Sequence, residues 1–288
     1  MNDNDRCPSV YLTKHKEERR CILPAGHQGK HYCPADAGSI HPYVWSEKHR
    51  PMTRRIGINL QDRTQQALRE DGVLEVHSVF PTLQGEGPFA GRPAVFVRLV
   101  GCNLQCPLCD TDYTSKRAFM TSERLVNDVK DVMPPGGRLV VITGGEPFRQ
   151  ALGQFVREAI HEGFAVQIET NGTLYVDDMP WASDQLTVVC SPKTPAINPR
   201  LAERVTFFKY VLRHGEVDQQ DGLPTRTLGN GTAVYKPWGS FPRDRVYVQP
   251  LDEDEAGRNA RNAAACVQSA MQFGYTYSHQ IHKLLNLE

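Results

Sequence analysis

Three cysteines lie within eight positions of this sequence. Cys102, Cys106 and Cys109 occur in "GCNLQCPLCDTDYT", directly after the apolar run "AVFVRLV" (94–100). Two thiols this close would suggest a redox pair, and four would complete a tetrahedral zinc site. Three leave a four-iron cluster one protein ligand short, so one iron stays open to a molecule that is not protein. The spacing therefore predicts a 4Fe–4S cluster; an incomplete zinc knuckle or three unrelated buried thiols are the alternatives.

Four more polar motifs end apolar runs in the same way. They are "TGGEP" (143–147) after "RLVVIT" (138–143), "ETNG" (169–172) ending "FAVQIET" (164–170), "SPK" (191–193) ending "LTVVCS" (186–191), and "QP" (249–250) ending "RVYVQP" (245–250). In parallel α/β proteins the reactive groups collect at the carboxyl ends of the strands. Five strand ends are therefore expected to face one site.

The elements that position these motifs alternate between two types. Besides the runs above, "VLEVHSVF" (73–80) and "VTFFKYVL" (205–212) predict strands, and 121–133, 149–163 and 254–274 have helical patterns. Strands alternating with helices indicate βαβ units on a parallel sheet, either a partial (β/α)6 barrel or an open α/β sheet. The segment 213–244, rich in Gly, Pro and Asp, is predicted to be a long irregular insertion.

Composition narrows the class of protein. The 288 residues include 33 Lys plus Arg and 33 Asp plus Glu, which gives no reason to propose a nucleic-acid or membrane partner. No apolar stretch approaches the roughly 20 residues needed to span a bilayer, and the N-terminus lacks the apolar core of a secretory signal. Eight cysteines in such a chain favour metal binding over disulfides and a reducing, cytoplasmic location.

The chain is expected to have two parts, a Cys/His-rich N-terminal extension (1–70) and a body (71–288). A short polar helix over 59–72, ending at Gly72, is predicted to connect them. The extension has few large apolar residues, so a structural metal could substitute for a core. Candidate Zn2+ ligands are Cys7, Cys21, His27 and His31, with Cys33 as an alternate thiolate; a solvated tail is the competing interpretation.

The cysteine spacing resembles the signature of the radical S-adenosylmethionine enzymes, and "TGGEP" is similar to that family's motif for the methionine amino group. Further, "FPTLQGEGPFAGRPAVFVRLVGCNLQCPLCDT" is similar, nearly position by position, to the start of the 7-carboxy-7-deazaguanine synthases. "ETNGT", "SPK", "FKYV", "QPL" and "SHQIHKLL" resemble that family in its order, so the resemblance covers roughly 73–288. The resemblance leaves out the N-terminal extension, and this chain also departs from the family in the 213–244 insertion and in "PLC".

The resemblance implies a fold and an activity. The fold is the trimmed, six-stranded barrel of the radical S-adenosylmethionine type, in a homodimer. The activity is that of a carbon–nitrogen lyase of 7-deazapurine (queuosine-type) biosynthesis, converting 6-carboxy-5,6,7,8-tetrahydropterin to 7-carboxy-7-deazaguanine with loss of ammonia. The implied cofactors are the 4Fe–4S cluster, S-adenosylmethionine and Mg2+, with an external electron donor of the flavodoxin or ferredoxin type. The radical arises at the cluster and cofactor, so no catalytic side chain is predicted.

Carried over position by position, the resemblance also implies binding residues. The substrate contacts are Leu83, Gln84, Gly85, Glu86, Arg98, Thr143, Glu169 and Asn171. The cofactor contacts are Leu108, Cys109, Asp110, Gly145, Glu146, Ser191, Pro192, Lys193 and Gln249, and Thr111 is the Mg2+ ligand. The closing segment contains His279, Gln280, His282 and Lys283.

The chemistry of these residue types agrees with those roles. A Gln amide can donate and accept along the edge of a flat heterocycle, and Arg98 can hold a carboxylate with two parallel hydrogen bonds. A Thr hydroxyl is a hard oxygen that suits Mg2+. The plain alternatives are turns for "QGEGP" and "NG", a structural Arg98, and a helix N-cap for Thr111. Cys190 and Cys266, in apolar stretches, are predicted to be small hydrophobic residues.

Two other functions remain open at this point. An activase that makes a glycyl radical on another protein would use the same cysteine spacing, although "QGEG" and "SPK" favour a small-molecule substrate. A non-catalytic zinc or iron–sulfur binding module is the alternative from another class. The missing fourth ligand counts against it, and the net charge of zero gives a nucleic-acid-binding form no support.

Overall fold

The computed structural model describes residue 59, residues 63–228, 231–237 and 239–287, and the backbone of four short strands nearer the N-terminus. The chain divides into two units, Met1–Thr53 and Arg54–Glu288. In the first, β1 (Val10–Leu12) pairs antiparallel with β2 (Glu18–Arg20), and β3 (Lys30–His31) with β4 (Trp45–Ser46).

The proposed zinc ligands fall in this first unit. Cys7, Cys21, His27 and Cys33 lie outside the described residues, and of His31 only the backbone in β3 is described. The division after Thr53 comes earlier in the chain than the boundary expected at residue 70, because Thr64 and Ala67 hydrogen-bond to later residues of the second unit.

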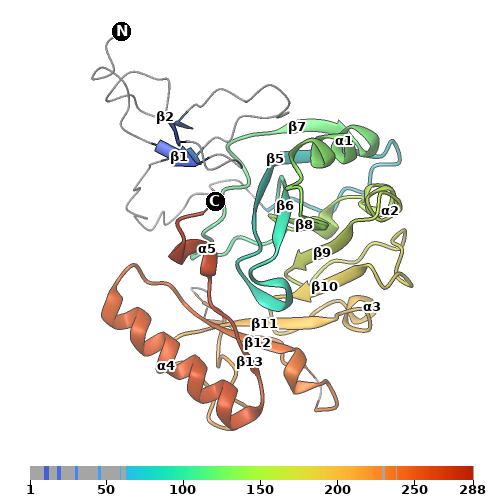
Figure 1. Ribbon diagram of the computed structural model, residues 1–288. Helices are drawn as coiled ribbons and strands as arrows, with labels where there is room; N and C mark the ends of the chain where they lie inside the picture. The colour runs from blue at the N-terminus through green and yellow to red at the C-terminus, as the bar shows by residue number, and fades with distance from the viewer. Residues whose placement is uncertain are drawn as a thin grey trace. The chain divides into compact units, whose positions relative to one another are not determined.

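The described part of the second unit is built on a nine-stranded sheet in the order β13-β12-β11-β10-β9-β8-β6-β5-β7 (Figure 1). The strands are β5 (Val73–Leu83), β6 (Pro93–Leu99), β7 (Ala118–Thr121), β8 (Leu139–Gly144), β9 (Ala165–Thr170), β10 (Leu186–Cys190), β11 (Phe207–Leu212), β12 (Val246–Pro250) and β13 (Thr276–Tyr277). All neighbours from β6 to β13 are parallel, whereas β5 is antiparallel to both β6 and β7. The seven strands predicted from apolar runs are confirmed, and β7 and β13 are additional.

Helices lie between the strands, and the last helix follows the last strand. They are α1 (Ser122–Val132), α2 (Gly153–His161), α3 (Pro199–Ala202), α4 (Ala256–Phe273) and α5 (Ile281–Leu284), with single 3₁₀ turns η2 (Gly87–Phe89), η3 (Pro147–Arg149) and η4 (Arg243–Arg245). The Thr121 hydroxyl accepts from Arg124 N and caps α1, and Gly274, with φ 76°, ends α4 in the left-handed conformation. The three predicted helices are therefore confirmed as α1, α2 and α4.

The two faces of the sheet differ in character. Residues of one face pack with the helices in a single core that includes Val97, Leu99, Val140, Ile142, Val166, Ile168, Val188, Cys190, Phe208, Leu125, Phe155, Val156 and Cys266. Cys190 and Cys266 are fully buried there, which confirms their prediction as small hydrophobic residues. Because side chains alternate along a strand, the neighbours of these core residues face the opposite side. The strand registers place Arg98, Thr143, Gln167, Glu169, Lys209 and Gln249 together on that second face.

The polar helix expected over 59–72 is wrong for the residues described. Residues 63–70 contain no helix, and Ala67 forms a parallel bridge to Gln150. Ala67 N donates to Arg149 O at 2.8 Å, and Gln66 Nε2 donates to Phe148 O at 2.7 Å. Because the segment has no apolar stripe to bury, tertiary hydrogen bonds to the η3 turn prevail over helix propensity.

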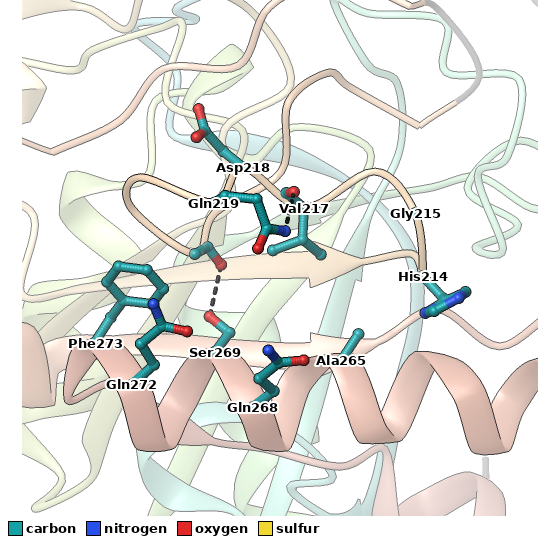
Figure 2. A pocket seen from close by; sticks show the side chains of 11 residues that line it. His214, Gly215, Val217, Asp218, Gln219, Ala265, Gln268, Ser269, Gln272 and Phe273 are labelled. Atoms are coloured by element: carbon teal, nitrogen blue, oxygen red, sulfur yellow. Dashed lines mark hydrogen bonds between the residues drawn. The ribbon is translucent and has the colours of Figure 1, made fainter.

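The insertion 213–244 is tied to α4 by hydrogen bonds in its described part. Ser269 Oγ donates to Gly222 O at 2.6 Å, a contact drawn in Figure 2, and Tyr275 Oη donates to Asp221 O at 2.7 Å. Residues of the insertion and α4 line the groove in Figure 2, and none of them is a predicted site residue.

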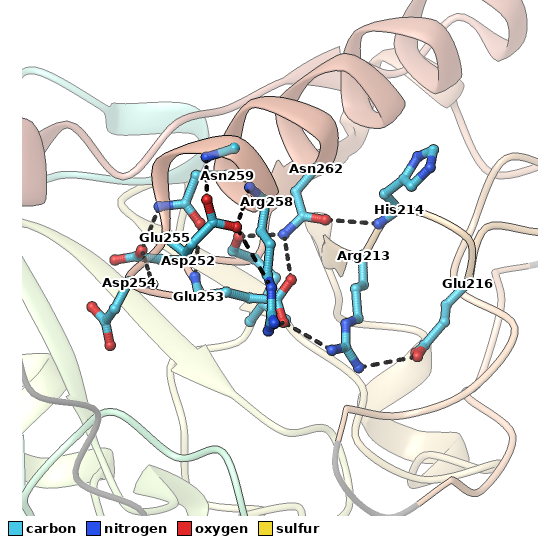
Figure 3. Close-up of polar contacts among 12 residues, drawn as sticks. Arg213, His214, Glu216, Asp252, Glu253, Asp254, Glu255, Arg258, Asn259 and Asn262 are labelled. Carbon is cyan, nitrogen blue, oxygen red and sulfur yellow. Dashed lines mark hydrogen bonds and ion pairs between the residues drawn. The ribbon is translucent and has the colours of Figure 1, made fainter.

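A polar cluster at the start of α4 anchors the insertion a second time (Figure 3). His214 N donates to Asn262 Oδ1 at 2.8 Å, and Arg213 Nη2 donates to Glu253 Oε1 at 2.9 Å. Asn262 Nδ2 also donates to Leu251 O at 2.8 Å, directly after β12. The insertion is therefore irregular, as predicted, but it is held by specific contacts.

Within the described residues, no helix has the length and apolar character needed to cross a membrane.

Candidate active site

The three cysteines lie on the loop that leaves the carboxyl end of β6. Gly101, with φ 83°, reverses the chain there, and Cys109 N donates to Cys106 O at 3.1 Å to close a turn. All three thiols are half-buried. Burial raises the pKa of each, for Cys102 to about 12, and the charges of Cys106 and Cys109 add to that rise. The structure thus brings the three predicted thiols together.

This donor set fits an iron–sulfur cluster. Burial makes the free thiolates unfavourable, and a cationic iron centre would supply the missing positive charge. No three His, Cys, Asp or Glu side chains within the described ranges converge on a single metal ion. A four-iron cluster takes its ligands at separate corners, so its thiolates need not meet at one point.

The two glycines of "TGGEP" make room for the protein's own backbone. A Cβ on Gly145 would lie 1.9 Å from Gly101 O, and one on Gly144, whose φ is 131°, would lie 2.2 Å from Leu99 O. Glu146 N then donates to Gly101 O at 2.9 Å. The resemblance makes Gly145 a cofactor contact, and the structure shows in addition that these glycines allow β8 to approach β6 and the cysteine loop closely.

The carboxyl of Glu146 is fully buried and bonded to neighbouring loops. Its Oε1 accepts from Phe148 N at 3.0 Å and Thr170 Oγ1 at 2.7 Å, and its Oε2 accepts from Asn171 N at 2.8 Å. Burial raises its pKa to about 7, although these three hydrogen bonds oppose the rise. Glu146 therefore connects "TGGEP" to "ETNG".

Asn171 continues this connection to the cysteine loop. Its Nδ2 donates to Asn103 Oδ1 at 3.0 Å, and its Oδ1 accepts from Thr173 Oγ1 at 2.6 Å. Asn103 Nδ2 in turn donates to Thr173 Oγ1 at 2.7 Å. The ends of β6, β8 and β9 are thus joined by a continuous set of hydrogen bonds.

A second polar cluster surrounds Lys209, which sequence analysis did not select. Its side chain is 8% exposed, and Nζ is ion-paired with Glu86 Oε2 and lies 3.7 Å from Glu169 Oε2. Burial alone would lower the pKa of Lys209, but the charges of Glu169 and Glu86 outweigh it and raise the pKa above its usual value. Burial likewise opposes ionisation of Glu86, yet Lys209 and Gln280 bring its pKa down to about 2. The pair is therefore charged at neutral pH.

Three glutamines complete this Lys209 cluster. Gln84 Nε2 and Gln167 Nε2 donate to Glu169 Oε1 at 3.0 and 2.9 Å. Gln280 Nε2, near the C-terminus, donates to Glu86 Oε1 at 2.5 Å. Sequence analysis also missed Gln167. The signal that could have revealed both Gln167 and Lys209 is a polar residue inside an otherwise apolar strand.

The remaining predicted substrate residues lie around this cluster. Arg98 on β6 is paired in register with Thr143 on β8, and its guanidinium lies 5.1 Å from the centroid of Phe80. Leu83 ends β5. Gly85 follows, and a Cβ there would meet His282 Nδ1 at 1.8 Å.

The closing segment lies against the "LQG" loop and the cysteine loop. Ile281 N donates to Gly85 O at 3.1 Å. Lys283 Nζ lies 3.3 Å from Asp110 Oδ2 and 3.5 Å from Asp252 Oδ2. His279 bonds to Tyr277 Oη at 2.8 Å, away from these loops.

The predicted cofactor residues lie at the ends of β10 and β12 and in the cysteine loop. Lys193 Nζ donates to Ser191 O at 3.2 Å and to its hydroxyl; burial lowers the pKa of Lys193. Gln249 is buried, and its Oε1 has no hydrogen-bond partner within the described part of the chain. Leu108 lies in the cysteine loop, and Pro192 lies in the loop that follows β10.

Thr111 follows the last cysteine, and its hydroxyl donates to Asp110 Oδ1 at 3.4 Å. No helix begins at Thr111, so the alternative of a helix N-cap is wrong, and Thr121 caps α1 instead. The hydroxyl is half-buried beside an exposed carboxylate, an oxygen pair that a hard cation could use.

A thiol triad after β6 and a Gly-Gly-Glu turn after its neighbour β8, on a largely parallel α/β sheet, are the features of a radical S-adenosylmethionine enzyme. In agreement, the model of the Radical SAM superfamily matches residues 96–182. The crystal structure of QueE from Escherichia coli superimposes with a TM-score of 0.56, covering 72% of this chain and 94% of that one at 24% identity. The predicted fold class is confirmed.

Curated relatives identify the family. The 7-carboxy-7-deazaguanine synthase of Rhodospirillum rubrum is 43% identical over 224 residues, covering 74% of this chain and 92% of the relative. Those of Rickettsia prowazekii and Hyperthermus butylicus are each 35% identical, covering 77% and 75% of this chain and 92% and 94% of the relatives. The chain belongs to the 7-carboxy-7-deazaguanine synthase family, as its motifs predicted.

Proposed function

We propose that this protein converts 6-carboxy-5,6,7,8-tetrahydropterin to 7-carboxy-7-deazaguanine with loss of ammonia. The observation that carries this proposal is that relatives named for that product match the chain over nine-tenths of their length. The geometry supports it, because the thiol triad and a polar cluster suited to a heterocycle lie at the same edge of the sheet. The family assignment favours this activity over a glycyl-radical activase or a non-catalytic module.

The superfamily uses a 4Fe–4S cluster and S-adenosylmethionine, which together supply a one-electron reductive cleavage that starts hydrogen abstraction. Cys102, Cys106 and Cys109 would hold the cluster. The buried, unpartnered amide oxygen of Gln249 would accept a hydrogen bond from the bound cofactor, and Ser191 and Lys193 would contact the cofactor as well. Gly145 and Glu146 would contact the cofactor as well, and they hold the end of β8 against the cysteine loop and the end of β9.

The chain's own residues bind and orient the substrate. Arg98 would hold the carboxylate through charge-assisted hydrogen bonds. Glu169 and Gln84 would contact the donors and acceptors of the pterin edge, with Thr143 beside Arg98. Lys209 offsets one of the two negative charges of Glu86 and Glu169 and so reduces their repulsion of an anionic substrate.

Further components belong to the same proposal. Mg2+ would bind at Thr111, next to Asp110, together with substrate and water. An external flavodoxin or ferredoxin would supply the electron, the active form would be a homodimer, and the reaction would take place in the reducing cytoplasm. The N-terminal cysteines and histidines would hold a structural Zn2+.

The test is turnover by the anaerobically purified full-length protein. Reconstituted with iron and sulfide and given dithionite, S-adenosylmethionine, Mg2+ and the carboxy-tetrahydropterin, it should release 7-carboxy-7-deazaguanine and ammonia. Replacing all three cysteines by alanine should abolish both bound iron and turnover, and omitting Mg2+ should slow it. Reductive cleavage of S-adenosylmethionine without consumption of the pterin would contradict the proposal and favour the activase.

A further inference from the structure

Asn59 lies against the cysteine loop, although it precedes the region that resembles the family. The residue is 8% exposed, and both ends of its amide contact the loop. Its Nδ2 donates to Thr111 O at 2.7 Å and lies 3.8 Å from Cys109 Sγ. Its Oδ1 accepts from Tyr113 N at 3.3 Å and Thr114 Oγ1 at 3.2 Å. One side chain therefore fixes the loop from the third cysteine to residue 114.

Thr64, in the same segment, contacts the first cysteine of the triad. Thr64 N donates to Cys102 O at 2.8 Å, which holds the start of the loop. The segment from Asn59 to Thr64, which belongs to the second unit, thus hydrogen-bonds to the first and the third cysteine of the triad.

These contacts have a consequence for electron transfer. A hydrogen bond to a thiolate ligand withdraws electron density from the iron–sulfur centre and raises its reduction potential. Reduction adds negative charge to the cluster, so a nearby N–H donor stabilises the reduced form more than the oxidised one. The Asn59 amide is oriented to act in this way on Cys109.

We propose that Asn59 is a positioning residue that holds Cys109 and Thr111 in place and makes the cluster easier to reduce. The segment that precedes the family-like region then contributes to radical formation. This inference rests on the cluster assigned under the proposed function.

The test uses two variants of Asn59 and a matched control in the full-length, reconstituted protein. Asn59→Ala removes all four contacts. Asn59→Asp keeps the acceptor for Tyr113 and Thr114 but loses the donor to Cys109 and to Thr111 O. Gln66→Ala is the control, because Gln66 lies in the same segment and donates to Phe148 O and Tyr175 O, not to the cysteine loop. Iron per chain and an EPR-monitored reductive titration are measured for each protein.

Both Asn59 variants should have a more negative reduction potential than wild type. At the potential at which half of the wild-type cluster is reduced, the ratio of reduced to oxidised cluster in Asn59→Ala should be about fivefold lower than in wild type. This is the effect of losing one hydrogen bond. Gln66→Ala should titrate like wild type. Loss of iron in Asn59→Ala but not in Gln66→Ala would also support the positioning role.

Two results would overturn the inference. One is unchanged potentials in both Asn59 variants at full iron content, and the other is equal loss of iron in Asn59→Ala and Gln66→Ala. A wild-type protein with a reducible cluster but no pterin turnover would contradict the proposed function alone. Full turnover with unaltered potentials in the variants would contradict only the role of Asn59.

Discussion

The two sides of the active-site edge are built in different ways. On the cysteine side, the ends of β6 and β8 are joined through backbone groups, with glycines at the closest approaches, and Glu146 and Asn171 connect them to β9 through side-chain hydrogen bonds. On the Lys209 side, the β5 end, β11 and the C-terminal segment are joined through charged and amide side chains. The cysteine side therefore depends on close backbone packing, and the Lys209 side depends on charge.

The difference follows from what each side must do. Three thiolates have to be presented at fixed positions, and short hydrogen-bonded loops give such precision. A substrate that carries a carboxylate and several ring nitrogens requires donors, acceptors and balanced charge. The two sides should therefore respond to different kinds of substitution, and this can be measured.

The largest effect is expected on the backbone-built side, from Gly145→Ala. A Cβ there would lie 1.9 Å from Gly101 O, so β8 and the cysteine loop would have to separate. We expect a loss of more than about 4 kcal/mol in unfolding free energy, together with loss of bound iron. Thermal unfolding and iron analysis of the full-length protein measure both.

Gly136→Ala is the matched control for this prediction. No heavy atom lies within 4 Å of a Cβ placed there, so the change should alter stability by less than about 0.5 kcal/mol. If the two substitutions lowered the unfolding free energy and the bound iron equally, the contact with Gly101 would not be the reason that residue 145 must be glycine.

The second effect is expected on the charged side, from Lys209→Met. Removing Lys209 leaves the carboxylates of Glu86 and Glu169 buried without their cation, at a cost of about 3–5 kcal/mol. Substrate affinity should fall as well, because the pocket gains uncompensated negative charge next to an anionic substrate. Unfolding and substrate-binding titrations test the two parts.

Lys236 provides a control for the loss of a lysine ion pair as such. It pairs with Asp218 at 2.9 Å and with Asp221, but its side chain is 28% exposed and lies in the insertion. Lys236→Met should cost no more than about 1 kcal/mol and leave substrate binding unchanged. Equal losses of stability and of substrate affinity in the two lysine variants would contradict the idea that burial makes the Lys209 ion pairs more important than those of Lys236.

The contrast between the two sides also explains how much could be predicted from sequence. Strands β5, β6 and β8–β12 and helices α1, α2 and α4 were predictable because apolar spacing within each segment specifies them. The cysteine triad and "TGGEP" were predictable because they are contiguous. The role of the glycines was not, since their neighbour, Gly101, belongs to another strand end.

The residues missed by sequence analysis share a physical cause. Lys209 contacts Glu86, 123 residues earlier, and Asn59 contacts Cys109, 50 residues later. A polar residue in an apolar strand is a local anomaly, but its partner is set by strand order and register. The helix expected over 59–72 failed for the same reason, because its backbone bonds to η3.

The smallest effect concerns Glu146, which combines both kinds of construction: a charged group held by backbone donors. Its pKa is raised by burial from 4.5 to about 7, so the folded protein binds this proton more tightly than the unfolded chain. The resulting stability is fully present below pH 4.5 and is lost as the pH rises through 7. Glu146→Gln does not titrate, so the stability of wild type relative to this variant should fall by about 2 kcal/mol between pH 5 and pH 8.

Because all three partners of Glu146 are donors, the Gln amide also leaves one of them unpaired, which lowers the variant's stability at every pH without changing the slope. Thermal unfolding of both proteins without S-adenosylmethionine, at pH 5, 6, 7 and 8, gives the difference directly. Parallel stability curves would mean that the three hydrogen bonds keep Glu146 ionised throughout, and that its loop is held by charge as firmly as the Lys209 cluster.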